Sequence, residues 1–185
     1  EMSGGIVMGG QADSAAYNGQ TYAGKGGNLY TPGSATISGG FLLDGEAGEG
    51  GNIYANGGQT EIGSGAAAFG GYATNYGGNI YSSGATIKIA GGSVLNGKTG
   101  QRGGNIYLAG VGKVELSNNG LVLNGTANNM GGNIGTASAS ATVDLLSGTV
   151  RGGSAGTGKN ICFFGAATLD MQDATVGGGV YASAG

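Results

Sequence analysis

Acidic side chains are the first candidates for chemistry in this sequence. Asp44, Glu46 and Glu49 lie close together along the chain, and glycoside hydrolysis requires paired carboxylates. Three further acids follow singly at wide intervals: Glu115, Asp144 and Asp170. Because each of these three stands alone in its stretch of chain, with Lys88 one interval earlier, they indicate a solvated charged row. We therefore expect no acid–base pair and no catalytic residue.

Other reactive residue types are scarce. The sequence has no His, so it offers no imidazole base and no His-containing metal site. The single Cys162 has no second Cys with which to form a disulfide or a metal cluster. Residues 97–99, Gly-Lys-Thr, have the letters that end a phosphate-binding loop, but no helical pattern follows them. Only seven basic residues are spread along the chain, so we predict no metal, no cofactor and no nucleic-acid partner.

A five-residue motif, Gly-Gly-Asn-Ile-Tyr, organises the chain. It occurs unchanged at three places and in variant form at three more, and successive Asn residues are 24, 27, 26, 28 and 27 residues apart. These residues are Asn28, Asn52, Asn79, Asn105, Asn133 and Asn160. A period of this length is typical of repeat architectures in which each unit stacks on the next. The small differences in period predict loops of varying length on a constant scaffold.

Two further segments recur within each period. The first alternates polar and apolar residues, as in Thr-Ile-Lys-Ile at 86–89, which is typical of a half-buried strand. The second ends in Asp-Gly or Asn-Gly, as in Val-Leu-Asn-Gly at 94–97, and these pairs favour tight turns. Glycine accounts for 47 of the 185 residues and interrupts every helical window. The chain is also 39% apolar with a net charge of −3, which excludes a disordered class.

These patterns predict an all-β fold, a single-stranded parallel β-helix. Identical segments every third strand are explained if each segment stacks on its own copy one turn later, about 4.8 Å away. We expect a right-handed coil of three short strands, repeated in about six to seven coils of 24–28 residues. Residues 1–185 form one domain, in which 11–25 make an unusually long corner. No apolar run approaches the length of a membrane span.

The motif residues are expected to form columns along the solenoid. The Ile or Leu after each Asn points inward, and the Asn residues form a structural amide ladder or, alternatively, a ligand-binding row. Four Tyr residues point outward: Tyr30, Tyr54, Tyr81 and Tyr107. They either shield the sheet by stacking on one another or present an aromatic surface to a glycan or protein partner.

A second outward row is predicted in the third segment of each coil. If the Leu before each Asp-Gly or Asn-Gly pair points inward, the residue before it points outward. This gives a candidate apolar packing row: Ile6, Leu42, Val94 and Val122. A slip of one residue would exchange the two faces.

The Gly-Gly-Asn-Ile-Tyr units, together with the strand Ile-Ala-Gly-Gly-Ser-Val-Leu-Asn-Gly at 89–97, resemble a known repeat. They are similar to the Gly-Gly-x-Ile repeats of parallel β-helix surface proteins, which include polymorphic outer-membrane proteins and autotransporter-like adhesins. The resemblance covers about residues 4–181. It implies an extracellular or cell-surface location and a non-enzymatic role.

Three functions are compatible with this architecture. The first is a structural protein that self-associates, head to tail or laterally, into a fibre or surface appendage, because residues 6–7 and 175–176 occupy the same phase of the coil. The alternative is an adhesin that binds other surface proteins or glycans through its Asn and Tyr columns. A second alternative is ice binding by a row of threonines: Thr36, Thr60, Thr86, Thr142 and Thr168.

Overall fold

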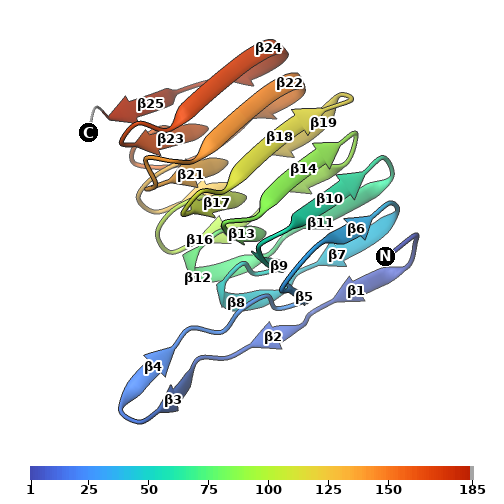
Figure 1. The fold of residues 1–185 in the computed structure, drawn as a ribbon, viewed down its shortest axis with the longest axis vertical. Helices are drawn as coiled ribbons and strands as arrows, with labels where there is room; N and C mark the ends of the chain where they lie inside the picture. Colours follow the sequence, from blue (N-terminus) through green and yellow to red (C-terminus); the bar gives the residue numbers. More distant parts are fainter. Residues whose placement is uncertain (184–185) are drawn as a thin grey trace.

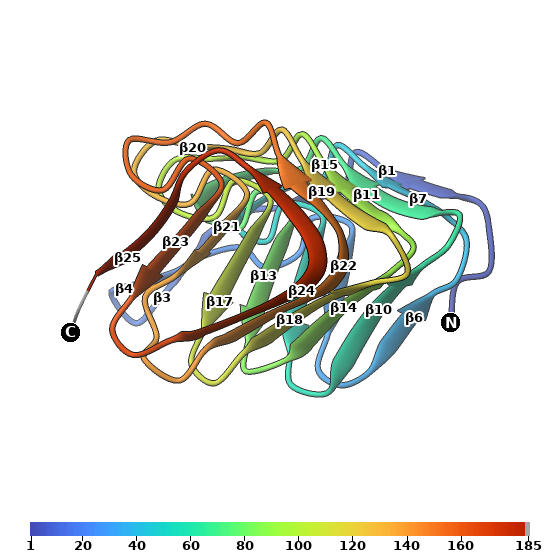
Figure 2. The same cartoon turned by 90° about the horizontal axis from the view of Figure 1, so that it is seen from above.

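The computed structural model describes residues 1–183 and confirms the β-solenoid. The described chain contains strands and no helix, and parallel strands stack in about six turns (Figure 1). Viewed from the C-terminal end, the chain runs anticlockwise as it rises towards the viewer, so the coil is right-handed as predicted (Figure 2).

Three walls and one row of short strands enclose the core. The first wall holds the Asn-Ile-Tyr segments: β5 (Leu29–Thr31), β9 (Ile53–Asn56), β13 (Ile80–Ser83), β17 (Ile106–Ala109), β21 (Ile134–Thr136), β23 (Ile161–Phe164) and β25 (Val180–Ser183). The second wall holds the alternating segments: β6 (Ala35–Ile37), β10 (Gln59–Gly63), β14 (Thr86–Ala90), β18 (Lys113–Ser117) and the first halves of β22 (Thr142–Arg151) and β24 (Thr168–Gly177).

The third wall continues the same sheet on the next side of the coil. It contains β1 (Ile6–Met8), β7 (Gly40–Leu43), β11 (Ala66–Phe69), β15 (Ser93–Leu95), β19 (Gly120–Leu123) and the second halves of β22 and β24. A row of corner strands then leads back to the first wall: β2 (Gln11–Ala12), β8 (Glu46–Glu49), β12 (Tyr72–Tyr76), β16 (Lys98–Thr99) and β20 (Thr126–Ala127). The three expected strands per coil are present, and the corner strand is an addition that the sequence pattern did not indicate.

The Ile column is confirmed as the inner face of the first wall. Leu29 pairs with Ile53, and the column continues upward through Ile80, Ile106, Ile134 and Ile161. The five Ile side chains have no exposed surface. They pack against the inward aliphatic residues of the other two walls and form one continuous core.

The predicted apolar row on the third wall is wrong for three of its four members. Leu42, Val94 and Val122 point inward and are buried, so the true register is one residue away from the expected one. The fourth member, Ile6, is 60% exposed because it pairs with Phe41 and not with Leu42. Both neighbours in each pair are apolar, and period two alone cannot tell which of them faces the core.

The Asp-Gly and Asn-Gly turns are confirmed at the corner after the third wall. Asp44, Asn96 and Asn124 have φ angles of 49°, 55° and 57°, a left-handed conformation that Asn and Asp tolerate. The following corner requires glycine, because a Cβ atom on Gly51 would lie 2.3 Å from the carbonyl oxygen of Gly78. The Gly-Gly pair of the motif is thus explained by close contact between successive coils.

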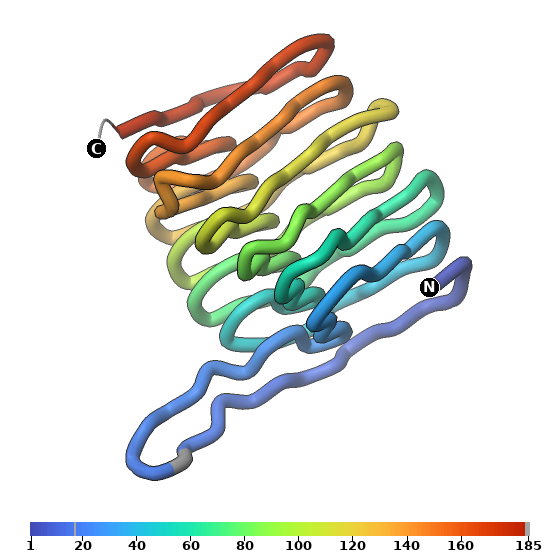
Figure 3. Tube along the Cα trace, viewed as in Figure 1, coloured from blue at the N-terminus to red at the C-terminus, as the bar shows by residue number. Residues whose placement is uncertain are grey.

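The long corner at residues 11–25 contains a small projection. After β2, the strands β3 (Ala15–Tyr17) and β4 (Gln20–Tyr22) pair as an antiparallel hairpin. The hairpin extends to the side of the first coil, along the line of β1 and β2 (Figures 1 and 3). It lies on the opposite side of the molecule from β1 and β7 (Figure 2), so it leaves the outer face of the third wall uncovered.

Candidate functional site

The six Asn residues form an unbroken ladder inside the corner before the first wall. The Nδ2 group of each of the first five Asn residues donates to the Oδ1 atom of the next Asn along the column, at 2.5–2.8 Å. The Nδ2 group of Asn160 donates to the Gly177 carbonyl. Five of the six side chains are buried, and only Asn28 at the end of the column is partly exposed. The side chains therefore lie in the core and not on the outer face.

Asn105 illustrates how each interior rung is satisfied. Its Oδ1 accepts hydrogen bonds from the Gly97 amide at 2.8 Å and from Asn79. Its Nδ2 donates to the Leu123 carbonyl at 2.8 Å and to Asn133. An amide side chain has two donor and two acceptor positions, so the interior rungs have none left for a ligand. This geometry agrees with the structural interpretation of the ladder and leaves no place for the ligand-binding one.

The four predicted Tyr residues form an outward stack on the first wall. Ring centroids are 5.4 Å apart for Tyr30 and Tyr54, 4.9 Å for Tyr54 and Tyr81, and 5.6 Å for Tyr81 and Tyr107. A fifth ring joins them, since Tyr76 from β12 stacks on Tyr107 at 4.7 Å. Tyr76 stands directly before the Gly-Gly pair of its motif, at a position where the other coils carry different residue types, so the repeat gave no sign of it.

Most of this aromatic stack is covered. Tyr54 and Tyr107 are only 4% and 7% exposed, whereas Tyr30 at the end of the column is 48% exposed. Lys25 covers Tyr54, with its Nζ atom 4.8 Å from the ring centroid. Burial raises the pKa of Tyr81 well above its ordinary value, and the nearby Glu49 carboxylate raises it further. The rings therefore shield the sheet more than they present a flat binding surface.

Arg102 takes part in the same layer of side chains. It lies next to Tyr107, with which it shares a side-chain hydrogen bond, and its guanidinium carbon is 5.7 Å from the centroid of Phe164 two coils further on. The intervening position of the Tyr column is Gly135, which has no side chain. Its missing side chain leaves room for Arg102 to cross the column. The only signal in the sequence is the interruption of the Tyr column itself.

Cys162 lies beyond Gly135 in the same column. The thiol is free and buried, and burial raises its pKa. Its place in the Tyr column is compatible with an exposed thiol or with a small buried side chain, and the structure shows the buried one.

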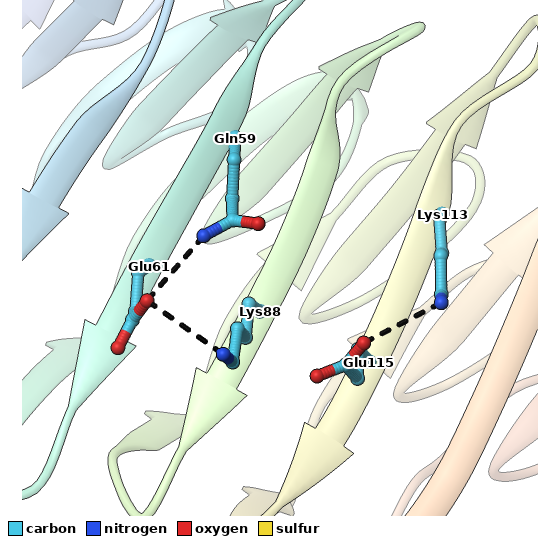
Figure 4. A network of polar contacts seen from close by, with 5 residues as sticks. All are labelled: Gln59, Glu61, Lys88, Lys113 and Glu115. Carbon is cyan, nitrogen blue, oxygen red and sulfur yellow. Dashed lines mark hydrogen bonds and ion pairs between the residues drawn. The ribbon is translucent and has the colours of Figure 1, made fainter.

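The acidic row predicted on the second wall is confirmed as a column of charged residues. Successive paired positions are Thr36, Glu61, Lys88, Glu115, Asp144 and Asp170. Glu61 lies 4.0 Å from Lys88, and Lys113 lies 3.4 Å from Glu115 (Figure 4). Lys113 also lies 2.7 Å from Asp144. These side chains are one fifth to one third exposed, so the column is a solvated ion-pair network.

The threonine row does not form. Thr36 belongs to the charged column, and Thr60 points inward and is buried. Thr86, Thr142 and Thr168 share a column, which Lys113 interrupts. The described surface therefore lacks the threonine ladder on which the ice-binding hypothesis depended.

The outer face of the third wall, here called the apolar face, carries large apolar side chains in two columns. Its members are Ile6, Met8, Phe41, Leu43, Phe69, Leu95, Leu121 and Leu123. Phe41, Leu43, Phe69 and Leu95 surround a shallow hollow of about 410 Å³ above Ala67. An exposed apolar surface of this kind marks an interaction site more often than a chance arrangement.

Among residues 1–183, no group of three or more His, Cys, Asp or Glu side chains is placed to hold a metal ion. The same residues include no helix that is long and apolar enough to cross a membrane. Asp44 and Glu46 are exposed, and Glu49 is half-buried beside Lys25. Burial raises the pKa of Glu49, and the positive charge of Lys25 lowers it in part.

Comparisons of the chain with family models, with curated proteins and with solved structures give no match. The similarity to β-helix surface proteins rests on the repeat motifs alone.

Proposed function

We propose that the protein is a non-enzymatic structural protein of the extracellular space or the cell surface. In this proposal, copies stack end to end and the solenoid continues across each joint to build a fibre or surface appendage. The location is supported by the resemblance of the repeats to those of surface proteins.

The observation that carries the proposal is the register that the first described coil shares with the last, beginning with the apolar columns of the first coil. A hollow of about 290 Å³ opens there, lined mainly by Met2, Val7, Leu29, Ile37 and Leu42. In the interior coils the corresponding columns are closed by the next coil. The first coil therefore presents the same apolar columns and strand edges that the solenoid elsewhere satisfies with its own neighbouring turn.

The last coil carries matching columns. Val176 continues the inward column of the third wall, to which Val7 also belongs. Val180 continues the inward column of the first wall, to which Leu29 belongs. Stacking a second copy would place each pair in contact in the parallel register used throughout the solenoid. Edge strands that match in this way favour open, head-to-tail assembly.

The Tyr column supports the same joint. Tyr181 at one end is 43% exposed and Tyr30 at the other is 48% exposed, and both occupy the outward Tyr column. End-to-end stacking would place these rings next to each other, as Tyr30 and Tyr54 already are. An adhesin that binds through the Asn and Tyr columns has less support, because the interior Asn amides are saturated and Tyr54 and Tyr107 are buried.

A complementation experiment tests end-to-end stacking. Val7→Asp places a charge on the first coil and Val176→Asp places one on the last, so each variant keeps one competent end. We expect the parent to form concentration-dependent rods in electron micrographs, and each variant alone to remain monomeric.

An equimolar mixture of the two variants should form dimers and no longer species, because only one pair of ends is intact. Circular dichroism melts must first show that both variants are folded. The proposal would be contradicted if the unmodified protein sedimented as a monomer at millimolar concentration, or if either variant alone still formed rods.

A further inference from the structure

The apolar face of the third wall is not explained by end-to-end stacking. It lies on the side of the coil, and its side chains point outward and take no part in the core columns. We propose that this face binds the same face of a second copy, with the two solenoids antiparallel and related by a two-fold axis that runs along the strands beside Ser93 and Leu95. This side-by-side pairing is independent of the function proposed above.

The two outward columns follow from the strand register. The first column is Ile6, Phe41, Ala67, Ser93, Leu121, Thr149 and Thr175. The second column is Met8, Leu43, Phe69, Leu95, Leu123, Arg151 and Gly177. A two-fold axis at the middle residue of each column relates the two copies. It places each residue of one copy opposite the residue of the other copy that lies equally far beyond the middle residue.

Side-chain sizes are complementary under this operation. Ala67, at the floor of the hollow, faces Leu121 of the other copy, and Phe41 faces Thr149. In the second column Phe69 faces Leu123. At the end of the columns the exposed Ile6 and Met8 face the small residues of the last coil. Large side chains thus meet small ones in the first column and in the outermost coils, as two interdigitating sheets about 10 Å apart require. In the middle of the second column large side chains meet each other.

The few charges at the margin of this face are also complementary. Asp44 follows Leu43 at the corner, and Arg151 occupies the second column three coils above Phe69. Under the proposed axis Arg151 of one copy lies opposite Leu43 and beside Asp44 of the other. The two-fold symmetry repeats this contact, so each pair of copies contains it twice. A parallel arrangement, in which the two solenoids point the same way, would instead exchange the two columns and set Arg151 opposite Thr149, away from Asp44. Charge complementarity therefore favours the antiparallel pair.

The expected affinity is modest. Seven coils at about 4.8 Å give a face roughly 30 Å long and about three residues wide. This is smaller than the ~800 Å² per partner of a standard interface. The pair is therefore expected to be weak for isolated copies and to gain strength from avidity when copies are also joined end to end.

Cysteine cross-linking tests the register directly. Leu95→Cys lies beside the axis and, with the two sheets about 10 Å apart, should be joined to its own copy by a short bismaleimide cross-linker, whereas Leu43→Cys is the matched control in the same outward column. Two Leu43→Cys residues would be about 19 Å apart along the solenoid axis, in addition to the separation of the sheets, and so would lie beyond the reach of a short cross-linker. All variants carry Cys162→Ala, and their melting curves must match that background.

With the short bismaleimide we expect Leu95→Cys to cross-link at least about tenfold faster than Leu43→Cys. A mixture of Leu43→Cys and Arg151→Cys should cross-link efficiently, although each alone does not. Equal rates for Leu95→Cys and Leu43→Cys, or no cross-linking of Leu95→Cys at millimolar concentration, would overturn the proposal. The end-blocking variants Val7→Asp and Val176→Asp leave this readout intact, so failure of either proposal can be recognised separately.

Discussion

The second and third walls of the solenoid belong to one eleven-stranded sheet and share one core, but their outer surfaces differ. Inside, both walls present aliphatic columns such as Ile89 and Val94, and both are buried. Outside, the second wall carries a charged column in which Glu61 pairs with Lys88. Glu115 and Asp144 of this column pair with Lys113 of the neighbouring column. The third wall carries apolar side chains that have no such internal partners. In both walls the core requires an apolar residue at each inward position. The residue at the neighbouring outward position can vary, and it determines what the wall contacts.

The largest effect is expected where inner and outer residues are adjacent. Val94→Asp places a charge in the core and should lower the free energy of unfolding by several kcal/mol. Leu95→Asp, one residue away on the apolar face, should change it by less than about 1 kcal/mol. Urea denaturation followed by circular dichroism measures both. Equal losses for the two variants would contradict the observed register of the third wall.

The Asn ladder closes the corner between the third wall and the first. Asn105→Ala leaves the Gly97 amide and the Leu123 carbonyl without their side-chain partner and interrupts the ladder on both sides. We expect a loss of about 2–4 kcal/mol in the free energy of unfolding. Asn128→Ala is the control, because Asn128 is exposed and should change the value by about 0.5 kcal/mol at most. Similar losses for the two would show that the ladder adds little to stability.

The first wall differs from the other two walls, because the Tyr rings of its outward column stack on one another and are largely buried. Burial raises the pKa of Tyr81, so an unfolded chain, in which tyrosine ionises near pH 10, loses its proton before the folded one does. This contribution to stability is complete below about pH 10 and is lost as the pH rises further. Tyr81→Phe removes it, so melting temperatures at pH 8 and 11 should differ less for the variant than for the parent. The same decline in both proteins would contradict the shift.

The smallest effect is expected on the charged outer face of the second wall. Lys113→Ala removes the contacts to Glu115 and Asp144, which are partly exposed. The free energy of unfolding should fall by less than about 1 kcal/mol, and the difference from the parent should shrink in 1 M salt. A loss as large as that of Asn105→Ala would mean that the outer charges, like the inner columns, hold the solenoid together.

The sequence predicted those features in which residue identity repeats. The Ile column and the Asn ladder recur in every period, and their places in the fold followed from that repetition. Leu42 and Leu43 could not be assigned in the same way, because both are apolar. Which of the two faces the core depends on how the three walls pack against each other, and the sequence pattern does not contain this information. Phe69 and Leu95 were therefore missed as members of the apolar face.

Residues at the corner before the first wall were missed for a different reason. Lys25, Tyr76 and Arg102 each stand three residues before the motif Asn, so their spacing to the Tyr column is fixed. The residue type at this position changes from period to period, so the column gave no repeated signal in the sequence. Their contacts arise from the tertiary path of the corner strands. The gap at Gly135 was visible in the sequence, but nothing in it indicated that Arg102 would lie across that gap.

The identical rungs of the Asn ladder have a consequence for how such a gene can change in length. Deleting residues 79–104 would join Gly77-Gly78 directly to Asn105-Ile106-Tyr107 and restore an intact motif. The amide of Asn52 would then meet Asn105 in the way it now meets Asn79. Whole periods can therefore be lost or duplicated by recombination between repeats without altering the chemistry of any junction. Length in this protein is an evolutionary variable that is separate from fold.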